Sequence, residues 1–188
     1  MPPSPTLRLQ LAPHPGTPCP AVHSLSVEVG RTAAGALCLA YRLAGDVAAL
    51  RLPPASAQPQ PSDGLWRHTC FEAFIGPASA TAYREFNFSP SGDWAVYDFA
   101  QERVRADAAP APAAPSLRFS QQGDALMLTA VTPLTPAPWP APAADTLLGL
   151  SAVIESADGQ LSYWALAHPR PQPDFHNRTG WTARLPAA

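Results

Sequence analysis

The 25 prolines of this 188-residue chain restrict where regular structure can form. Proline lacks a backbone N–H and removes one hydrogen bond from a sheet ladder, which excludes it from central strands. We therefore expect strands in the segments where proline is absent or rare. These segments are Ala21 to Leu52, Ser62 to Ala109 (interrupted only by Pro77 and Pro90), Ser116 to Thr132 and Ala143 to His168.

Apolar residues alternate with smaller or polar residues in these segments, as in strands with one buried face. Leu25, Val27 and Val29 show the pattern, and so do Leu37, Leu39, Tyr41 and Leu43. No segment repeats apolar residues at helical spacing over three turns, although the many alanines favour helices. The sequence predicts an all-β fold, an antiparallel two-sheet β-sandwich of ten or eleven short strands.

The length indicates one folded domain. We expect residues 1–20 to be a proline-rich N-terminal segment with a possible edge strand around Leu7, Leu9 and Leu11, and residues 21–188 to be the sandwich domain. The proline-rich stretches Pro110–Pro115 and Pro133–Pro142 are expected to be loops within it.

Composition excludes several classes of protein. The 12 basic residues, all Arg, are set against 14 acidic ones and are not clustered, so we expect neither nucleic-acid nor membrane binding. A hydrophobic content of 46% with five Trp and seven Phe argues against disorder. Residues 1–20 lack a continuous apolar stretch typical of secretory signals, so we expect a cytoplasmic protein.

A first hairpin is predicted at Ser91-Gly92, between segments 83–89 and 94–99. A two-residue turn there places Phe86 opposite Tyr97 and Asn87 opposite Val96. One face then carries the residues expected in the core, Phe86, Phe88, Ala95, Tyr97 and Phe99. The other face, which either binds a polar ligand or faces solvent, carries Glu85, Asn87, Ser89, Trp94 and Asp98.

A second hairpin is predicted at Asp158-Gly159, a dipeptide typical of two-residue turns. This turn places Val153 opposite Trp164. One face then carries Glu155, Trp164 and His168, which form either a ligand site or part of the core. The other face carries Leu150, Ala152, Ile154, Tyr163 and Ala165.

Glu72 is the only charge in the hydrophobic run from Thr69 to Ile75. A buried carboxylate is costly unless it is paired or hydrogen-bonded. Glu72 is therefore expected either to line a cavity or to pair with Arg67 or Arg84. The stiff segment from His168 to Arg178 has two interpretations as well. It either presents Asp174, His176 and Arg178 at a pocket rim or is a structural clamp with Phe175 as its plug.

Three groups of motifs resemble bacterial DOMON-like proteins, the superfamily that includes family 9 carbohydrate-binding modules. They are Leu65-Trp-Arg-His-Thr-Cys-Phe-Glu72, Tyr83-Arg-Glu-Phe-Asn-Phe-Ser-Pro-Ser-Gly92 with Trp94-Ala-Val-Tyr-Asp-Phe99, and Ser162-Tyr-Trp-Ala-Leu-Ala-His168. The resemblance covers most of residues 20–185. It implies a β-sandwich that binds sugars or haem and is usually not catalytic, with four tryptophans available for a sugar: Trp66, Trp94, Trp164 and Trp181.

We expect a non-catalytic domain that binds a small ligand, a sugar or glycoconjugate, without a metal or cofactor; a partner enzyme is not identifiable. The expected ligand-binding residues are Trp66, Glu72, Glu85, Asn87, Trp94, Glu155, Trp164, His168 and His176. One alternative is haem binding, with Met127 and His68, His168 or His176 as axial ligands. Another is a glycoside hydrolase that uses Glu72 and Glu85.

Overall fold

The computed structural model describes residues 7–106, 113–139 and 145–185. Twelve strands and three short 3-10 helices make up the regular structure of these residues, and none of them forms an α-helix. The strands are β1 (Leu7–Pro13), β2 (Val22–Arg31), β3 (Leu37–Gly45), β4 (Cys70–Pro77), β5 (Tyr83–Phe88), β6 (Trp94–Gln101), β7 (Val104–Arg105), β8 (Ser116–Gln122), β9 (Ala125–Thr132), β10 (Thr146–Glu155), β11 (Leu161–Ala165) and β12 (Ala183–Arg184). The 3-10 helices are η1 (Val47–Ala49), η2 (Leu65–Arg67) and η3 (Arg178–Gly180). No helix in the described part of the chain is long and apolar enough to span a membrane.

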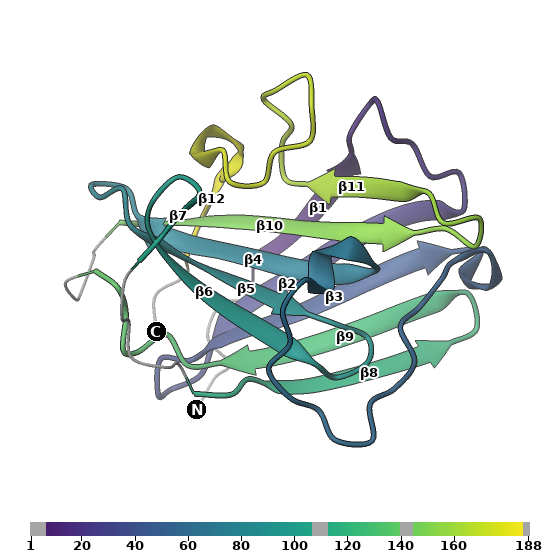
Figure 1. Cartoon of the computed structure of the whole chain (residues 1–188), viewed down its shortest axis with the longest axis horizontal. Helices are drawn as coiled ribbons and strands as arrows, with labels where there is room; N and C mark the ends of the chain where they lie inside the picture. The colour runs from purple at the N-terminus through teal and green to yellow at the C-terminus, as the bar shows by residue number, and fades with distance from the viewer. Residues whose placement is uncertain (1–6, 107–112, 140–144, 186–188) are drawn as a thin grey trace.

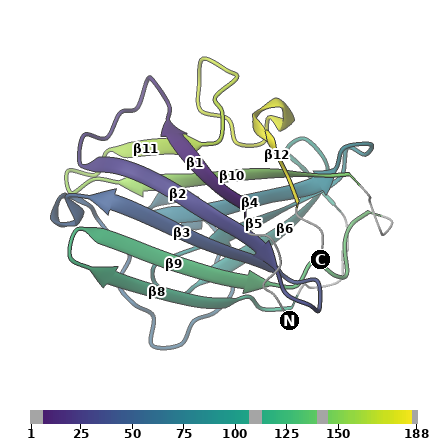
Figure 2. The same cartoon turned by 180° about the vertical axis from the view of Figure 1, so that it is seen from behind.

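All strand ladders are antiparallel, in the order β7-β6-β5-β4-β10-β11-β1-β2-β3-β9-β8, with β12 beside β10. β1 joins the two layers, because Leu7 to Leu11 pair with β2 whereas Ala12 and Pro13 pair with β11. The layer that contains β4, β5, β6 and β10 lies in front in Figure 1, and the layer of β2, β3, β9 and β8 lies in front in Figure 2. The predicted all-β antiparallel sandwich is confirmed.

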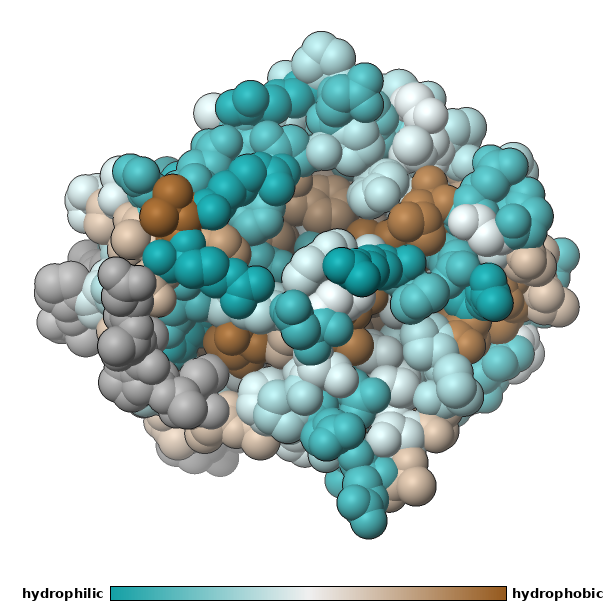
Figure 3. Space-filling model, in the orientation of Figure 1, coloured by the Kyte–Doolittle hydropathy of each residue, from teal (hydrophilic) through white to brown (hydrophobic). Residues whose placement is uncertain are grey.

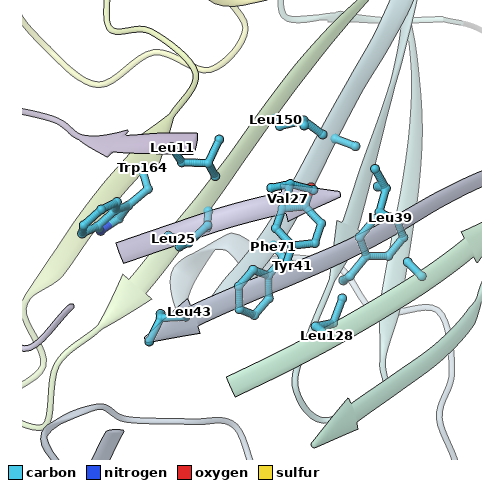
Figure 4. Close-up of a cluster of buried hydrophobic side chains, with 14 of the residues drawn as sticks. Leu11, Leu25, Val27, Leu39, Tyr41, Leu43, Phe71, Leu128, Leu150 and Trp164 are labelled. Atoms are coloured by element: carbon cyan, nitrogen blue, oxygen red, sulfur yellow. The ribbon is translucent and has the colours of Figure 1, made fainter. Parts of the chain in front are cut away.

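The main core lies between the two layers. The alternating residues of β2 and β3 supply one side, and residues of β4, β5, β10 and β11 supply the other. Figure 4 shows part of this contact, including Val27, Tyr41, Phe71, Leu150 and Trp164. The Tyr41 hydroxyl donates a hydrogen bond of 2.7 Å to the backbone carbonyl of Glu72, which satisfies a buried polar group and links the layers.

The predicted register of the first hairpin is wrong by one residue. Phe86 pairs with Val96 and Glu85 pairs with Tyr97. The cause is a loop of three residues, in which the Gly92 N–H donates to the Ser89 carbonyl and Gly92 has φ of 93°. A shift of one residue turns every side chain of a strand to the other face. Tyr97 and Phe99 therefore leave the main core, while Trp94 and Asp98 lie on the side of Phe86.

The second hairpin deviates in the same way. Val153 pairs with Tyr163 and Ala152 pairs with Trp164, because the loop contains three residues and ends in Gly159 at φ of 85°. Trp164 therefore points into the main core, together with Leu150, Ala152 and Ile154, whereas Tyr163 points outward. The strand ends at Ala165, so His168 is not part of the ladder.

The first 20 residues contain β1, which is the edge strand of each layer over part of its length. The proline-rich stretches 113–115 and 133–139 contain no strand. Residues 1–6, 110–112 and 140–142 of the predicted N-terminal segment and loops lie outside the described residues.

Candidate functional site

A cavity of about 380 Å³ lies on the outer face of the layer formed by β4, β5, β6, β10 and β11. This volume is in the range typical of sites for small molecules. The face is turned toward the viewer in Figure 1, and Figure 3 shows hydrophobic residues in a hollow between hydrophilic ridges. The cavity is lined by Trp66, Glu72, Phe74, Glu85, Tyr97, Phe99, Arg103, Arg105, Val153, Tyr163, Pro173, Phe175 and His176.

Strand alternation places the acidic groups in this cavity. On β4, Phe71, Ala73 and Ile75 belong to the main core, so Glu72 and Phe74 point to the opposite face. On β5, Phe86 and Phe88 belong to the core, so Glu85 points outward. The outer face is itself covered by η2, by the β6–β7 turn and by the segment before β12, which explains why β4 and β5 are buried on both faces.

The two carboxyl groups lie at the bottom of the cavity with few partners. Glu72 is 2% exposed and accepts one long hydrogen bond, 3.4 Å, from the Ser151 hydroxyl. Glu85 is 5% exposed and accepts a bond of 2.6 Å from Asn87 Nδ2. Loss of solvation raises the pKa of Glu72 well above its ordinary value, and the charge of Glu85 raises it further. Burial likewise raises the pKa of Glu85 to about 7.

Tyr83 orients the imidazole of His176 above Glu85. The Arg103 N–H donates to the Tyr83 oxygen over 3.1 Å, and the Tyr83 oxygen lies 2.6 Å from His176 Nδ1. Because this oxygen already accepts a bond, we infer that its O–H donates to Nδ1, which leaves the ring proton on Nε2. Nε2 lies 3.7 Å from Glu85 Oε2 and faces the cavity. Burial, followed by the charge of Arg103, lowers the pKa of His176 to about 4, so the ring is neutral at pH 7.

Aromatic rings form the walls. Trp66, from η2, contacts the edge of Tyr97 with ring centres 5.8 Å apart. The Arg105 guanidinium lies 3.6 Å from the centre of the Tyr97 ring, a cation–π contact. Behind Phe74, the Trp181 indole lies against Gly149, where an added Cβ would be 2.4 Å from Trp181 Cδ1. A glycine at this position is thus required for the close approach of the indole to β10.

Ion pairs close one side of the mouth. Arg103 contacts Asp174 at 2.8 Å, and Arg170 contacts Asp174 at 3.4 Å and Glu102 at 3.7 Å. Arg178 donates to the backbone carbonyl of Pro77 and lies 4.8 Å from the centre of the Trp181 ring. The segment from His168 to Arg178 therefore combines both sequence-based interpretations: its middle lines the mouth and its end clamps the fold.

Of the nine predicted site residues, the cavity brings together Trp66, Glu72, Glu85 and His176. Asn87 lies beneath it, where it donates to Glu85. Glu72 forms an ion pair with neither Arg67 nor Arg84 among the described residues, and Arg84 instead contacts Asp98 at 2.7 Å on the opposite face.

The other four predicted residues lie elsewhere. Trp94 pairs with Phe88 on the core side of β6, and Trp164 is buried in the core. Glu155 binds His68 at 2.8 Å and Arg51 at 3.2 Å, outside the cavity. His168 is hydrogen-bonded to the Ala12 carbonyl over 2.9 Å. The expectation that all nine converge on one hollow is therefore wrong. The shifted registers turn Trp94 and Trp164 toward the core, whereas Glu155 and His168 are held outside the cavity by their own partners.

Several lining residues were not expected from the sequence. The correct register of the first hairpin would have identified Tyr97 and Phe99, and that of the second would have identified Tyr163. Arg105 belongs to the short β7 and Arg103 lies in the turn directly before it, and the position of both depends on long-range packing. No local signal in the sequence indicates them.

Met127 and His176 do not fit the two sides of one haem group. Met127 lies on the outer face of the β3–β9 layer, opposite Arg42 and Ser120. His176 lies on the outer face of the other layer, and the core separates the two. Strand alternation thus prevents Met127 and the cavity histidine from acting as an axial pair.

Comparison with known proteins identifies the fold. No protein-family model matches the sequence, and no curated protein is significantly similar to it. A candidate carbohydrate-binding protein from Bacteroides uniformis ATCC 8492 has a similar structure, with a TM-score of 0.59 and 13% sequence identity. The match covers 95% of this chain and 84% of the other. At this identity the similarity demonstrates a shared fold.

Proposed function

We propose that this chain binds a small carbohydrate in the cavity without chemically changing it. One observation carries the proposal: aromatic rings and buried carboxyl groups line the same open hollow. The apolar face of a pyranose packs against aromatic rings, here Trp66, Tyr97 and Phe175. The sugar hydroxyls can donate to Glu72 and Glu85 and accept from His176 Nε2.

The shared fold supports the proposal, since the Bacteroides uniformis protein carries the description of a candidate carbohydrate-binding protein. We further propose that the chain is a relative of DOMON-like proteins and family 9 carbohydrate-binding modules. The support is that the motifs of that resemblance contribute Trp66, Glu72, Glu85, Tyr97 and Tyr163 to the cavity.

Calorimetric titration with a panel of mono- and disaccharides tests the binding. We expect at least one sugar to bind, and Trp66→Ala to weaken that binding about tenfold, which corresponds to 1.4 kcal/mol. Trp94→Ala is the matched control, because Trp94 is also half-buried but lies outside the cavity. It should leave the affinity unchanged. A panel without any heat of binding would refute the proposal, as would equal effects of the two substitutions.

A second candidate function is glycoside hydrolysis by Glu72 and Glu85. One observation favours it: Glu72 pairs with Asn87 and Glu85 pairs with Phe74, so the two carboxyls are diagonal neighbours on one face. Such neighbours are separated by about 7–8 Å at the backbone. Burial raises the pKa of both carboxyls, which suits one of them to act as the proton donor while the other acts as the base or nucleophile.

Release of a chromophore from aryl glycosides tests this second candidate. Glu72→Gln and Glu85→Gln should each reduce turnover at least 100-fold. Wild-type protein without turnover on a broad set of aryl glycosides, or variants that retain full activity, would exclude it and leave the binding function intact.

A further inference from the structure

The charges around the cavity are balanced at its mouth but not at its bottom. At the mouth, Arg103 is paired with Asp174 at 2.8 Å, and Arg105 lies 3.9 Å from Asp63. At the bottom, neither Glu72 nor Glu85 has an arginine nitrogen within 4 Å in the described part of the chain. The basic group nearest to Glu85 is His176, at 3.7 Å, and its imidazole is neutral at pH 7. Arg105 and Arg103 also line the cavity and act on Glu85 from a longer distance, but burial outweighs them and the pKa of Glu85 stays raised.

Both carboxyl groups also have unused hydrogen-bonding capacity. A carboxylate offers about four lone-pair positions, whereas Glu72 and Glu85 each accept one bond from a protein side chain, from Ser151 and Asn87 respectively. A sugar hydroxyl contributes one donor to these positions. A protonated amine contributes three donors and no acceptor, together with a positive charge in direct contact with the carboxyl groups.

The walls of the cavity favour a cation as well. The faces of aromatic rings attract positive charge, and Arg105 already occupies one such position over Tyr97. Trp66, Phe74 and Tyr163 surround the carboxyl groups with further aromatic surface. An acidic floor inside an aromatic wall is complementary to an ammonium group and leaves the sugar ring in contact with the indole.

We propose that the cavity selects a sugar with a free amino group, whose ammonium is directed toward Glu72 and Glu85. This inference rests on the proposed carbohydrate-binding function and specifies the class of sugar. An N-acetylated sugar lacks the charge and presents a methyl group to the acidic floor, so it should bind as weakly as the parent neutral sugar.

Binding of such a sugar has a proton signature. In the empty cavity burial raises the pKa of both carboxyl groups and so favours their protonated forms, and at a pKa of about 7 part of the Glu85 population carries a proton at pH 7. The ammonium replaces these protons as the partner of the carboxylates, and they pass to the buffer. A neutral sugar leaves them in place, because it brings no charge.

Calorimetry at pH 7 with glucosamine, glucose and N-acetylglucosamine tests the inference. The titrations are performed in phosphate and in MOPS, two buffers that differ in heat of ionisation and carry no primary amine that could compete for the site. We expect glucosamine to bind at least tenfold more tightly than the two neutral sugars, with a heat that depends on the buffer and reports proton release.

Variants localise the effect. Glu72→Gln and Glu85→Gln should each reduce glucosamine affinity about tenfold, toward that of glucose. Glu28→Gln, on the outer face of the other layer, should not change it. Glucose bound as tightly as glucosamine, or a buffer-independent heat, would overturn this inference and leave the proposed function standing. Absence of binding by the whole sugar panel would overturn both.

Discussion

Replacement of Glu85 by glutamine should stabilise the ligand-free protein at high pH. The pKa of this carboxyl is raised by burial from 4.5 to about 7 in the folded state. A group with a raised pKa contributes fully to stability below the unfolded-state value, and that contribution is lost as the pH rises through the folded-state value. The wild-type protein should therefore lose stability between about pH 4.5 and 7.

The size of the effect follows from the two pKa values. A difference between 4.5 and about 7 corresponds to about 3 kcal/mol, at 1.36 kcal/mol for each factor of ten. Glutamine keeps an oxygen that can accept the bond from Asn87 Nδ2 and carries no charge. Glu85→Gln should thus match wild type near pH 4.5 and exceed it by up to about 3 kcal/mol at pH 8.

Urea unfolding at pH 4.5, 6, 7 and 8, followed by tryptophan fluorescence, measures this difference. Glu28→Gln serves as the control, since Glu28 is half-exposed on the other layer, where it pairs with the exposed Arg8, and its curve should run parallel to wild type. The reasoning is refuted if Glu85→Gln also runs parallel to wild type, or if the difference grows toward low pH.

Two further substitutions test the support of the site. Gly149→Ala places a methyl group where a contact of 2.4 Å with the indole of Trp181 arises, and should cost about 1–3 kcal/mol and weaken sugar binding. Arg84→Gln leaves the buried carboxylate of Asp98 without its cation, and should cost about 3–5 kcal/mol while the affinity of the folded protein stays unchanged. Chemical unfolding measures the loss of stability, and calorimetry measures the affinity for sugar. Unchanged affinity in Gly149→Ala together with weakened affinity in folded Arg84→Gln would contradict this description of the two faces.

The strands were predictable because two physical signals agreed. Proline-free segments marked the places where a ladder can form, and period-two alternation identified the buried side of β2 and β3. Those signals depend on the local chain alone, and each of the four segments named from them contains at least two strands in its described part.

The registers of the two hairpins were not predicted correctly from the sequence, although one residue indicated the true length of the first loop. Pro90 would be the ladder residue directly before a two-residue turn at Ser91-Gly92, where its N–H would have to bond the Asp93 carbonyl, and proline has no N–H. It suits a three-residue loop that ends in glycine, as seen at Gly92. Recognition of this loop would have placed Tyr97 in the cavity.

The remaining parts of the site could not be predicted from local patterns. Tertiary packing positions Arg105, His176 and Trp66 over the face of β4 and β5, and all three lie in loops or short elements. The carboxyl groups were identifiable because a charge in a hydrophobic strand requires an explanation. The loop residues that cover these carboxyl groups could not be identified, because a loop has no periodic pattern that indicates which residues it contacts.

A crystal structure of the protein soaked with the tightest-binding sugar tests the central claim most directly. We expect density for the sugar ring against Trp66, with polar atoms within hydrogen-bonding distance of Glu72 and Glu85. The assignment would be contradicted if the acidic cavity were empty and the sugar lay elsewhere, either against Trp94 or in a separate hollow lined by Cys19 and Ser162.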